Sequence, residues 1–351
     1  MRAIVLVGGF GTRLRPLTLT SPKQMLPVAG RPMIERVLAH LSAHGVDDVV
    51  LSLGYRPDAF TEAYPDARCA GVSLHYAVEP EPLDTAGAIA FAARAAGIAE
   101  RFVVVNGDVL TDIDLTALLD RHEERGAEGT ISLTRVEDPS QFGVVPTDED
   151  GRVLAFVEKP ARDEAPTDLV NAGYYVLEGS VLDRIPPDHK VNIERETFPA
   201  MVASGGLYGW ADGAYWLDVG TPERLLQANL DVLDGRRAGV DVDQSDLTDV
   251  HPGAVVRSSL VGEHALVEDG ATVTRSALGR GVWIGEGAVV EDAVLLDGSS
   301  VGPGATVRRS LVGADASVQA GASVDELSVL GDGVKVEAGV RLTAARLPDG
   351  A

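Results

Sequence analysis

A glycine-rich stretch near the N-terminus, GGFGTRLRPLT from Gly8 to Thr18, carries two arginines, and Lys23 follows shortly after it in SPKQM. Small residues after an apolar run let backbone N–H groups approach an anion, and Arg13, Arg15 and Lys23 can surround that anion with positive charge. The pattern therefore predicts a loop that binds a polyphosphate. The loop alone leaves open an alternative, an ordinary strand-to-helix turn with solvated arginines.

Two common nucleotide-binding spacings are absent from this loop. The phosphate loop GxxxxGK[ST] needs a lysine after its last glycine, whereas Gly11 is followed by Thr12 and Arg13. The dinucleotide fingerprint GxGxxG needs a third glycine, and Leu14 stands in its place. If the loop binds phosphate, it does so by a different arrangement.

Length and charge limit the possible classes of protein. A chain of 351 residues exceeds the size of a typical single core, so we expect two domains. The net charge of −23 argues against nucleic acid or an anionic membrane as a partner. The apolar run before Gly8 is too short for a signal peptide or a membrane span, and the single cysteine, Cys69, cannot form an internal disulfide. We therefore expect a soluble cytoplasmic protein.

Residues 1–235 alternate apolar, strand-like runs with stretches of helical spacing, the pattern of an α/β sheet covered by helices on both faces. We expect strands at Ile4–Val7 and in VVLSL, RFVVV, TISLTRV, VLAFVE and LVNAGYYVL. We expect helices in RPMIERVLAHLSAHG, TAGAIAFAARAAG, DLTALLDRHEER and TPERLLQANLDVLDG. In the last helix Thr221 is the expected N-cap and Gly235 ends the run.

The period of the sequence changes from Val250 onward. Related segments recur every seventeen residues, beginning at Val250, Val267, Ile284, Val301 and Val318. Within a unit, aliphatic residues return at steps of six, six and five, which is typical of a hexapeptide-repeat β-helix with three short strands in each coil. An irregular β-sandwich is the alternative. We expect domains at residues 1–235 and 250–351, joined by a polar linker of residues 236–249.

Taken together, these blocks resemble a known family. LVGGFGTRLRPLTLTSPKQMLPVAGRPMI resembles the signature of the sugar-1-phosphate nucleotidyltransferases, and LDTAGAI, NGDVL, FVEKP, VNAGYYV and YWLDVGT match the family's other blocks in order. The resemblance implies a Rossmann-like (GT-A-like) α/β domain with a mixed sheet, followed by a left-handed parallel β-helix of hexapeptide repeats. The chain looks most like the GDP-mannose pyrophosphorylase branch, with the glucose-1-phosphate thymidylyltransferases as a related alternative.

The reaction implied by this resemblance joins a nucleoside triphosphate to a sugar 1-phosphate and releases pyrophosphate. The pair implied by the branch is GTP and mannose 1-phosphate. A phosphate monoester is already ionised at pH 7, so its oxygen can attack without a catalytic base. Two polyanions must instead be brought together by cations and a metal. By resemblance Asp108 and Asp218 hold Mg²⁺, which prefers oxygen ligands, although a lone aspartate at a strand end is more often a turn or helix cap.

The resemblance carries further roles onto matching residues. Arg13 and Lys23 are the catalytic cations that bind the triphosphate. Glu158 accepts hydrogen bonds from sugar hydroxyls, Lys159 binds the sugar's phosphate, and Asn171 binds another hydroxyl. Gly143 and Gly173 let the sugar approach the backbone. The expected nucleotide-binding residues are Leu6, Gly8, Gly9, Gly11, Thr12, Arg13, Glu79, Thr85 and Gly87.

One block departs from the family pattern, because GTAG or GTGG is here DTAG, with Asp84 in place of the first glycine. A carboxylate near the base or sugar can alter selectivity, so dTTP or UTP with glucose 1-phosphate, or an unusual sugar or cyclitol phosphate, remains an alternative. A protein that binds an NDP-sugar without catalysis is an alternative of another class.

The β-helix raises a separate possibility, because hexapeptide helices are also the scaffold of acyltransferases. Its histidines, His251 and His264, lie in no setting that we recognise from those enzymes, so only fold analogy supports acyl transfer. We expect a structural β-helix that favours homo-oligomers, because its terminal coils need cover.

Overall fold

The computed structural model describes residues 1–187, 189–237 and 249–348. Most of the expected linker, residues 238–248, lies outside the described residues. The described chain divides into two compact units. Among the helices of this described part, none is long and apolar enough to cross a membrane.

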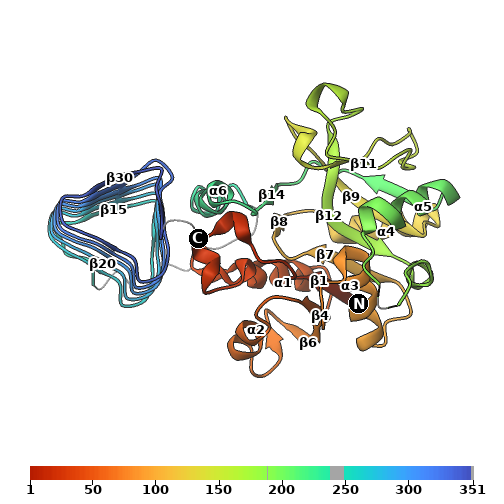
Figure 1. Ribbon diagram of the computed structural model, residues 1–351, viewed down its shortest axis with the longest axis horizontal. Coiled ribbons are helices and arrows are strands. Elements are labelled where there is room, and N and C mark those ends of the chain that lie inside the picture. The colour runs from red at the N-terminus through yellow and green to blue at the C-terminus, as the bar shows by residue number, and fades with distance from the viewer. Residues whose placement is uncertain (188, 238–248, 349–351) are drawn as a thin grey trace. The chain divides into compact units, whose positions relative to one another are not determined.

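The first compact unit joins Met1–Gly9 with Ile34–Trp216 and is built on a mixed sheet (Figure 1). The strands of this sheet are β1 (Arg2–Leu6), β4 (Asp48–Leu53), β5 (Arg68–Cys69), β6 (Val72–Val78), β7 (Phe102–Asn106), β9 (Gly129–Arg135), β10 (Gly143–Val144), β11 (Val157–Glu158), β12 (Leu169–Leu177) and β13 (Leu207–Trp210), and the unit also contains β8 (Val109–Thr111), which lies outside it. The order is β11-β10-β12-β7-β1-β4-β6-β5, and β9 pairs with both β12 and β13. Strands β7, β1, β4 and β6 run parallel, whereas β12 is antiparallel to β7.

Helices cover this sheet, and three of them, α1, α3 and α4, form where the sequence predicts helices, whereas α2 and α5 were not predicted. They are α1 (Met33–Ala43), α2 (Asp58–Ala63), α3 (Asp84–Ala95), α4 (Leu115–Arg125) and α5 (Phe198–Ser204). Helix α3 packs against β1 and β4, and α4 packs against β9 and β12. The Asp114 side chain accepts a hydrogen bond from Ala117 N and caps α4, which ends at Gly126 in the left-handed conformation. Buried residues of α3, α5 and the strands they cover form a hydrophobic core.

One expected strand is shorter than the sequence predicts. Of VLAFVE, only Val157–Glu158 forms a strand, while Val153 makes an isolated pairing with Thr147. Between them the chain leaves the ladder, since Leu154 is 57% exposed and its N–H donates to Pro146 O outside the sheet. Apolar alternation suggested a continuous strand here, but the ladder does not continue through these residues.

The second compact unit joins Phe10–Met33 with the chain from Leu217 onward. Its N-terminal segment holds three short 3-10 helices, η1 (Thr12–Leu14), η2 (Leu17–Leu19) and η3 (Lys23–Met25), and a small hairpin of β2 (Pro27–Val28) and β3 (Arg31–Pro32). Strand β14 (Trp216–Asp218) leads into α6 (Pro222–Leu233), which Thr221 caps as the sequence predicts. Buried Asn229 on α6 accepts a hydrogen bond from Ala29 N at 2.7 Å and so ties the helix to the N-terminal segment.

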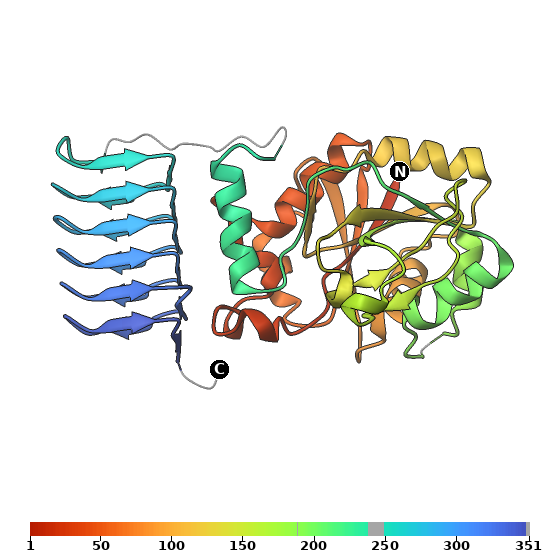
Figure 2. The same cartoon turned by 90° about the horizontal axis from the view of Figure 1, so that it is seen from above.

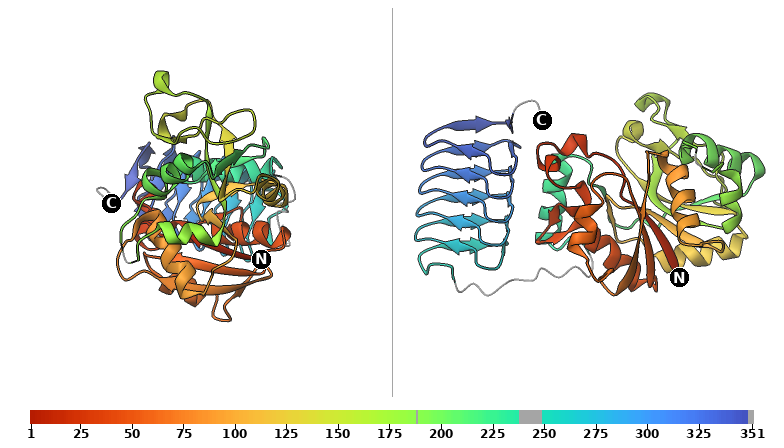
Figure 3. Two further views of the ribbon diagram at one scale, coloured as in Figure 1. Left: turned by 90° about the vertical axis from the view of Figure 1, so that its right-hand side faces the viewer. Right: turned by 60° about the horizontal axis from the view of Figure 1, so that its bottom comes forward.

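The C-terminal residues form a three-sided parallel β-helix, whose coils superpose as a triangle in Figure 1 and stack side by side in Figures 2 and 3. Its first sheet contains β15 (Val255–Arg257), β18 (Thr272–Thr274), β21 (Val289–Glu291), β24 (Thr306–Arg308), β27 (Ser323–Asp325) and β30 (Arg341–Thr343). The second sheet contains β16 (Leu260–Val261), β19 (Ala277–Leu278), β22 (Val294–Leu295), β25 (Leu311–Val312), β28 (Val329–Leu330) and β31 (Arg346–Leu347). The third sheet contains β17 (Leu266–Val267), β20 (Trp283–Ile284), β23 (Ser300–Val301), β26 (Ser317–Val318) and β29 (Lys335–Val336).

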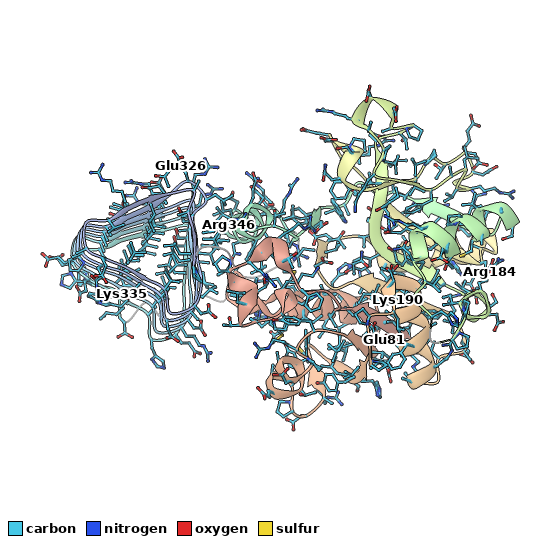
Figure 4. All side chains as sticks on the ribbon, viewed as in Figure 1. Glu81, Arg184, Lys190, Glu326, Lys335 and Arg346 are labelled. Carbon is cyan, nitrogen blue, oxygen red and sulfur yellow. The ribbon has the colours of Figure 1, made fainter. Side chains whose placement is uncertain are left out.

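The seventeen-residue period has the structural meaning that the sequence predicts. Val267, Val273, Leu278 and Ile284, at steps of six, five and six, all lie in the interior. Figure 4 shows side chains filling the interior of the triangle, and on β29 exposed Lys335 alternates with buried Val336. The fold thus confirms an α/β domain with a mixed sheet followed by a β-helix.

The structure also reveals an irregular coil that the sequence analysis missed. Thr306 pairs with Ser323, seventeen residues later, but Leu311 pairs with Val329, eighteen residues later. The extra residue falls at a corner, where Glu326 and Leu327 both have positive φ angles, 53° and 62°. Both neighbouring sheets keep their pairing because the corner absorbs the insertion.

Candidate active site

The glycine loop after β1 adopts a conformation that requires its glycines. Gly9 and Gly11 have φ angles of +101° and +59°, in the left-handed region that favours glycine. Space is also limited, because a Cβ on Gly11 would lie 3.0 Å from Thr18 Cγ2 and 3.3 Å from Lys23 Cβ. Thr18 Oγ1 donates to Gly11 O at 2.8 Å and closes the loop. The glycine turn therefore packs directly against the Lys23 side chain.

The second unit brings two of the predicted site residues together over Gly220. A Cβ on Gly220 would lie 2.5 Å from Arg13 Nη2 and 2.9 Å from Asp218 Oδ1. The guanidinium expected to bind the triphosphate and a carboxylate expected to bind the metal thus approach the same glycine. The sequence analysis quoted this block, YWLDVGT, but gave Gly220 no role. The available signal was a glycine two residues after a candidate metal ligand.

In the first unit, Leu6 and Asp108 lie at the carboxyl edge of neighbouring parallel strands. Leu6 pairs with Asn106, the last residue of β7, and Gly107 N donates to Leu6 O at 2.9 Å. A Cβ on Gly107 would lie 2.8 Å from Val7 Cγ1, so only glycine lets the two strand ends approach this closely. Asp108 follows at the edge where α/β sheets bind their ligands.

Three predicted nucleotide-binding residues surround the start of α3 and contact the protein's own groups. Glu79 Oε1 accepts from Ser52 Oγ at 3.2 Å and Glu79 Oε2 from Leu83 N at 3.0 Å, which shapes the turn before the helix. Thr85 Oγ1 accepts from Ile193 N at 2.9 Å. A Cβ on Gly87 would lie 2.6 Å from His189 O. Their roles in nucleotide binding stay predictions.

Asp84 occupies a position that explains why a glycine is usual in this block. Its φ angle is +61°, which glycine adopts freely and aspartate tolerates better than most residues. Asp84 Oδ1 accepts from Thr85 N at 2.7 Å and from Asn192 Nδ2 at 3.1 Å. The carboxylate therefore stabilises the start of α3 and holds Asn192.

The predicted sugar-binding residues Gly143, Glu158 and Lys159 lie on the β10–β11 hairpin. Gly143 pairs with Glu158, and a Cβ on Gly143 would lie 3.3 Å from Glu158 Oε2 and 2.5 Å from the Phe156 ring. Lys159 Nζ lies 3.2 Å from Glu158 Oε1. The hairpin thus presents one carboxylate and one ammonium side by side.

Asn171, on β12, has its amide bonded to neighbouring groups. Its Oδ1 accepts from Gly173 N at 2.9 Å, and its Nδ2 donates to Tyr175 Oη at 2.9 Å and to Glu194 Oε1 at 3.1 Å. Gly173 has a φ angle of +77°, and a Cβ there would lie 2.7 Å from Asn106 Nδ2. The left-handed backbone and the close packing against Asn106 therefore already require glycine at position 173, whether or not a sugar approaches it.

Glu194 is the acidic residue of this region that the sequence analysis missed. Burial raises the pKa of its carboxyl, and the nearby Glu158 charge raises it further, while the hydrogen bond from Asn171 opposes the shift. Burial and the Glu194 charge in turn raise the pKa of Tyr175. Glu194 belongs to NIERETF, a stretch without glycines or a recognised block, so no sequence signal marked it.

The predicted site residues therefore form two groups. In the first unit, Glu158 pairs with Lys159, and Asn171 bonds to Glu194. In the second unit, Arg13 and Asp218 meet over Gly220, and Lys23 lies beside Gly11. Within the described residues, no three His, Cys, Asp or Glu side chains gather closely enough to hold a metal by themselves.

Comparisons with known proteins find relatives for both parts of the chain. Residues 2–235 match the family model described as Nucleotidyl transferase, and residues 243–342 match the EIF2B subunit epsilon LbH domain, a left-handed β-helix. The chain is 43% identical over 274 residues to the mannose-1-phosphate guanylyltransferase of Mycobacterium tuberculosis, covering 78% of this chain and 71% of the relative. It is 42% identical over 228 residues to the mannose-1-phosphate guanylyltransferase catalytic subunit beta of Dictyostelium discoideum, covering 64% of this chain and 63% of that subunit.

A solved structure shows the same fold. HddC from Yersinia pseudotuberculosis, complexed with GMP-PN, superposes with a TM-score of 0.57 at 28% identity. The match covers 66% of this chain and 99% of HddC.

Proposed function

Because this chain belongs to the nucleotidyl transferase family, we propose that it transfers a guanylyl group from GTP to mannose 1-phosphate, giving GDP-mannose and pyrophosphate. The observation that carries the choice of substrates is the 43% identity to the Mycobacterium tuberculosis enzyme named for that reaction. Because the chain spans about seven tenths of that relative and less than two thirds of the Dictyostelium subunit, the substrates are proposed from the shared part.

Binding of the triphosphate is the task of the glycine loop and its cations. The backbone of Gly8, Gly9 and Gly11 offers N–H groups without side chains in the way. Arg13 and Lys23 supply positive charge to the α-phosphate oxygens and to the leaving pyrophosphate. Gly220 leaves room for Arg13 to keep this position.

Attack by the sugar phosphate needs orientation more than proton transfer. The phosphate oxygen of mannose 1-phosphate is ionised at neutral pH, so the protein's contribution is to hold it in line with the α-phosphorus. Lys159 binds that phosphate, and Glu158 beside it accepts a hydrogen bond from a sugar hydroxyl. The ion pair at 3.2 Å sets the spacing between the two contacts.

Members of the family generally use a divalent metal ion, and we assign Mg²⁺ to Asp108 and Asp218. The residues fit that ion, because both are carboxylates and Mg²⁺ prefers oxygen ligands, usually one or two carboxylates together with phosphate and water. Bound Mg²⁺ would neutralise charge on the phosphates during transfer. Loss of either carboxylate is expected to weaken metal binding.

Pyrophosphate release tests the proposal directly. Purified protein would be supplied with GTP, dTTP, UTP, ATP or CTP and with mannose or glucose 1-phosphate, in Mg²⁺ or in EDTA. We expect Mg²⁺-dependent release to be fastest with GTP and mannose 1-phosphate. Faster release with another pair would overturn the substrate assignment, and no release with any pair would favour an NDP-sugar-binding protein without catalysis.

The β-helix and the cell compartment are further parts of the proposal. Outward apolar side chains are exposed on its first coil, with Val255 38% and Leu266 44% exposed, and on its last coil, with Val340 39% exposed. We propose that these terminal coils take part in homo-oligomers. A strict monomer in light scattering at micromolar concentration would contradict the oligomer.

The cytoplasm is the proposed location, since the free Cys69 suits a reducing compartment.

A further inference from the structure

The segment from Val191 to Thr197 connects the predicted nucleotide and sugar regions of the first unit. At one end, Val191 O accepts from Ala86 N at 2.9 Å, and Ile193 N donates to Thr85 Oγ1 at 2.9 Å. Residues Ile193–Thr197 then form a turn of π-helix, an uncommon conformation that is frequent at functional sites. Asn192 caps this turn, since its Oδ1 accepts from Glu194 N and Arg195 N.

The turn directs Glu194 toward Asn171. The hydrogen bonds of these two side chains show which of them can still bond to a ligand. Asn171 already uses both amide hydrogens, for Tyr175 and Glu194, and one lone pair of its Oδ1, for Gly173. It therefore has no hydrogen left to donate to a sugar. In the described part of the chain, Asn171 is the hydrogen-bond partner of the Glu194 side chain, through Oε1 alone. The other oxygen, Oε2, is available to a donor.

Charge around Glu194 favours a ligand that donates hydrogen bonds. Its carboxylate lies near the carboxylates of Glu158 and Asp84 and near one ammonium, that of Lys159. Carboxylates in a partly buried place repel one another, and hydroxyl donors relieve that cost because each brings a hydrogen without bringing negative charge. A sugar offers several hydroxyls on adjacent carbons, which suits two neighbouring carboxylates.

We propose that Glu194 is a sugar-binding and specificity-determining residue, which accepts a hydrogen bond from a ring hydroxyl of the sugar 1-phosphate while Glu158 accepts from another. Asn171 is then a positioning residue that holds Glu194, rather than a donor to the sugar. This inference rests on the proposed function, because the hydroxyls in question belong to the sugar 1-phosphate.

Glu194→Gln is the first test, since it keeps the shape of the side chain and removes its charge. We expect kcat/KM for mannose 1-phosphate to fall about ten- to hundredfold, the usual loss for a charged hydrogen bond to substrate, while the KM for GTP changes by less than about twofold. Glu196→Gln is the matched control. It lies on the same turn, is exposed, and keeps the oxygen that accepts from Asn192 N, so we expect near wild-type kinetics.

Deoxy sugars identify the contact independently of any loss of stability. The wild type and Glu194→Gln would be compared on mannose 1-phosphate and on its 2-, 3-, 4- and 6-deoxy forms. One deoxy form should cost the wild type about tenfold or more in kcat/KM but cost the variant little, because the variant has already lost that contact. Asn171→Ala should resemble Glu194→Gln in this pattern, because Glu194 loses its support.

Two results would overturn the inference. One is wild-type kcat/KM in Glu194→Gln; the other is an equal loss in the variant for every deoxy form, which would indicate only a general disturbance of the fold. Failure of the proposed function looks different, because the wild type would then not release pyrophosphate from GTP and mannose 1-phosphate. In that case the same variants would be assayed with whichever sugar 1-phosphate the wild type uses.

Discussion

The β-helix and the α/β unit place their important residues in different ways. In the β-helix, each inward side chain stacks on a residue about seventeen positions away, so one repeated pattern defines the whole core. In the α/β unit, Asn171 contacts Glu194 and Asp84 contacts Asn192, and the residues of the second pair are 108 positions apart. A repeat can therefore be recognised from local spacing, whereas a site built from distant residues is visible only after folding.

The largest expected effect comes from a change that alters chemistry and leaves the fold intact. We predict that Asp108→Asn lowers kcat at least about a thousandfold, or about 4 kcal/mol of transition-state stabilisation, because one proposed Mg²⁺ ligand is lost. Thermal unfolding should remain cooperative, with a melting temperature near that of the wild type. Steady-state pyrophosphate release and calorimetry measure the two quantities. Activity within tenfold of the wild type would exclude Asp108 from the metal site.

A second change tests whether the glycine beside the candidate site matters as much as the charged residues. We predict that Gly220→Ala lowers kcat about a hundredfold, because a Cβ would lie 2.5 Å from Arg13 Nη2 and 2.9 Å from Asp218 Oδ1 and would displace both. The control is Gly235→Ala at the end of α6, where nothing lies within 4 Å of the new methyl group, although the φ angle of +69° there costs some stability. We expect the control to leave kcat unchanged; if it lowers kcat as much as Gly220→Ala does, the displacement explanation is wrong.

A matched pair in the β-helix tests the opposite kind of region. Val290 is fully buried in the interior, whereas its neighbour Val289 faces outward. We predict that Val290→Ala lowers the free energy of unfolding by about 1 to 3 kcal/mol, because it leaves a cavity in a packed coil, and that Val289→Ala lowers it by less than about 0.5 kcal/mol. Denaturant titration measures both. Similar losses would show that the interior of the β-helix is not tightly packed.

The smallest expected effect is a pH dependence in the α/β unit. Buried His122 contacts Thr130 Oγ1 at 2.9 Å and Glu178 Oε1 at 3.0 Å, and Arg101 Nε donates to Glu178 at 2.7 Å. Burial lowers the pKa of His122, although the bond to Glu178 opposes this shift. Below about pH 6.5 the unfolded chain therefore binds a proton more readily than the folded chain, so stability falls as the pH falls.

The size of this effect has an upper limit. One proton changes the free energy of unfolding by at most about 1.4 kcal/mol per pH unit. We predict that His122→Gln flattens the pH dependence of the unfolding free energy between pH 7 and pH 5, measured by denaturant titration. An unchanged slope in His122→Gln would contradict the prediction.

Parts of the fold and site could be read directly from the sequence. Helix α6 begins after Thr221 and the β-helix repeats from Val250, because capping and inward packing act between residues close in sequence or at a fixed period. Similarly, Gly9 and Gly11 marked a turn, because few other residues adopt their conformation. The ordered blocks also pointed to the nucleotidyl transferase family, which the comparisons confirm.

Only the tertiary structure decided which side chains meet. No sequence pattern joins Glu194 to Asn171, places Arg13 over Gly220, or pairs Asp84 with Asn192. Each contact depends on how strands and turns distant in sequence pack, and the left-handed backbone at Asp84 appears only in that packing. Local spacing determined the elements of this protein, whereas non-local packing decided the contacts of its candidate site.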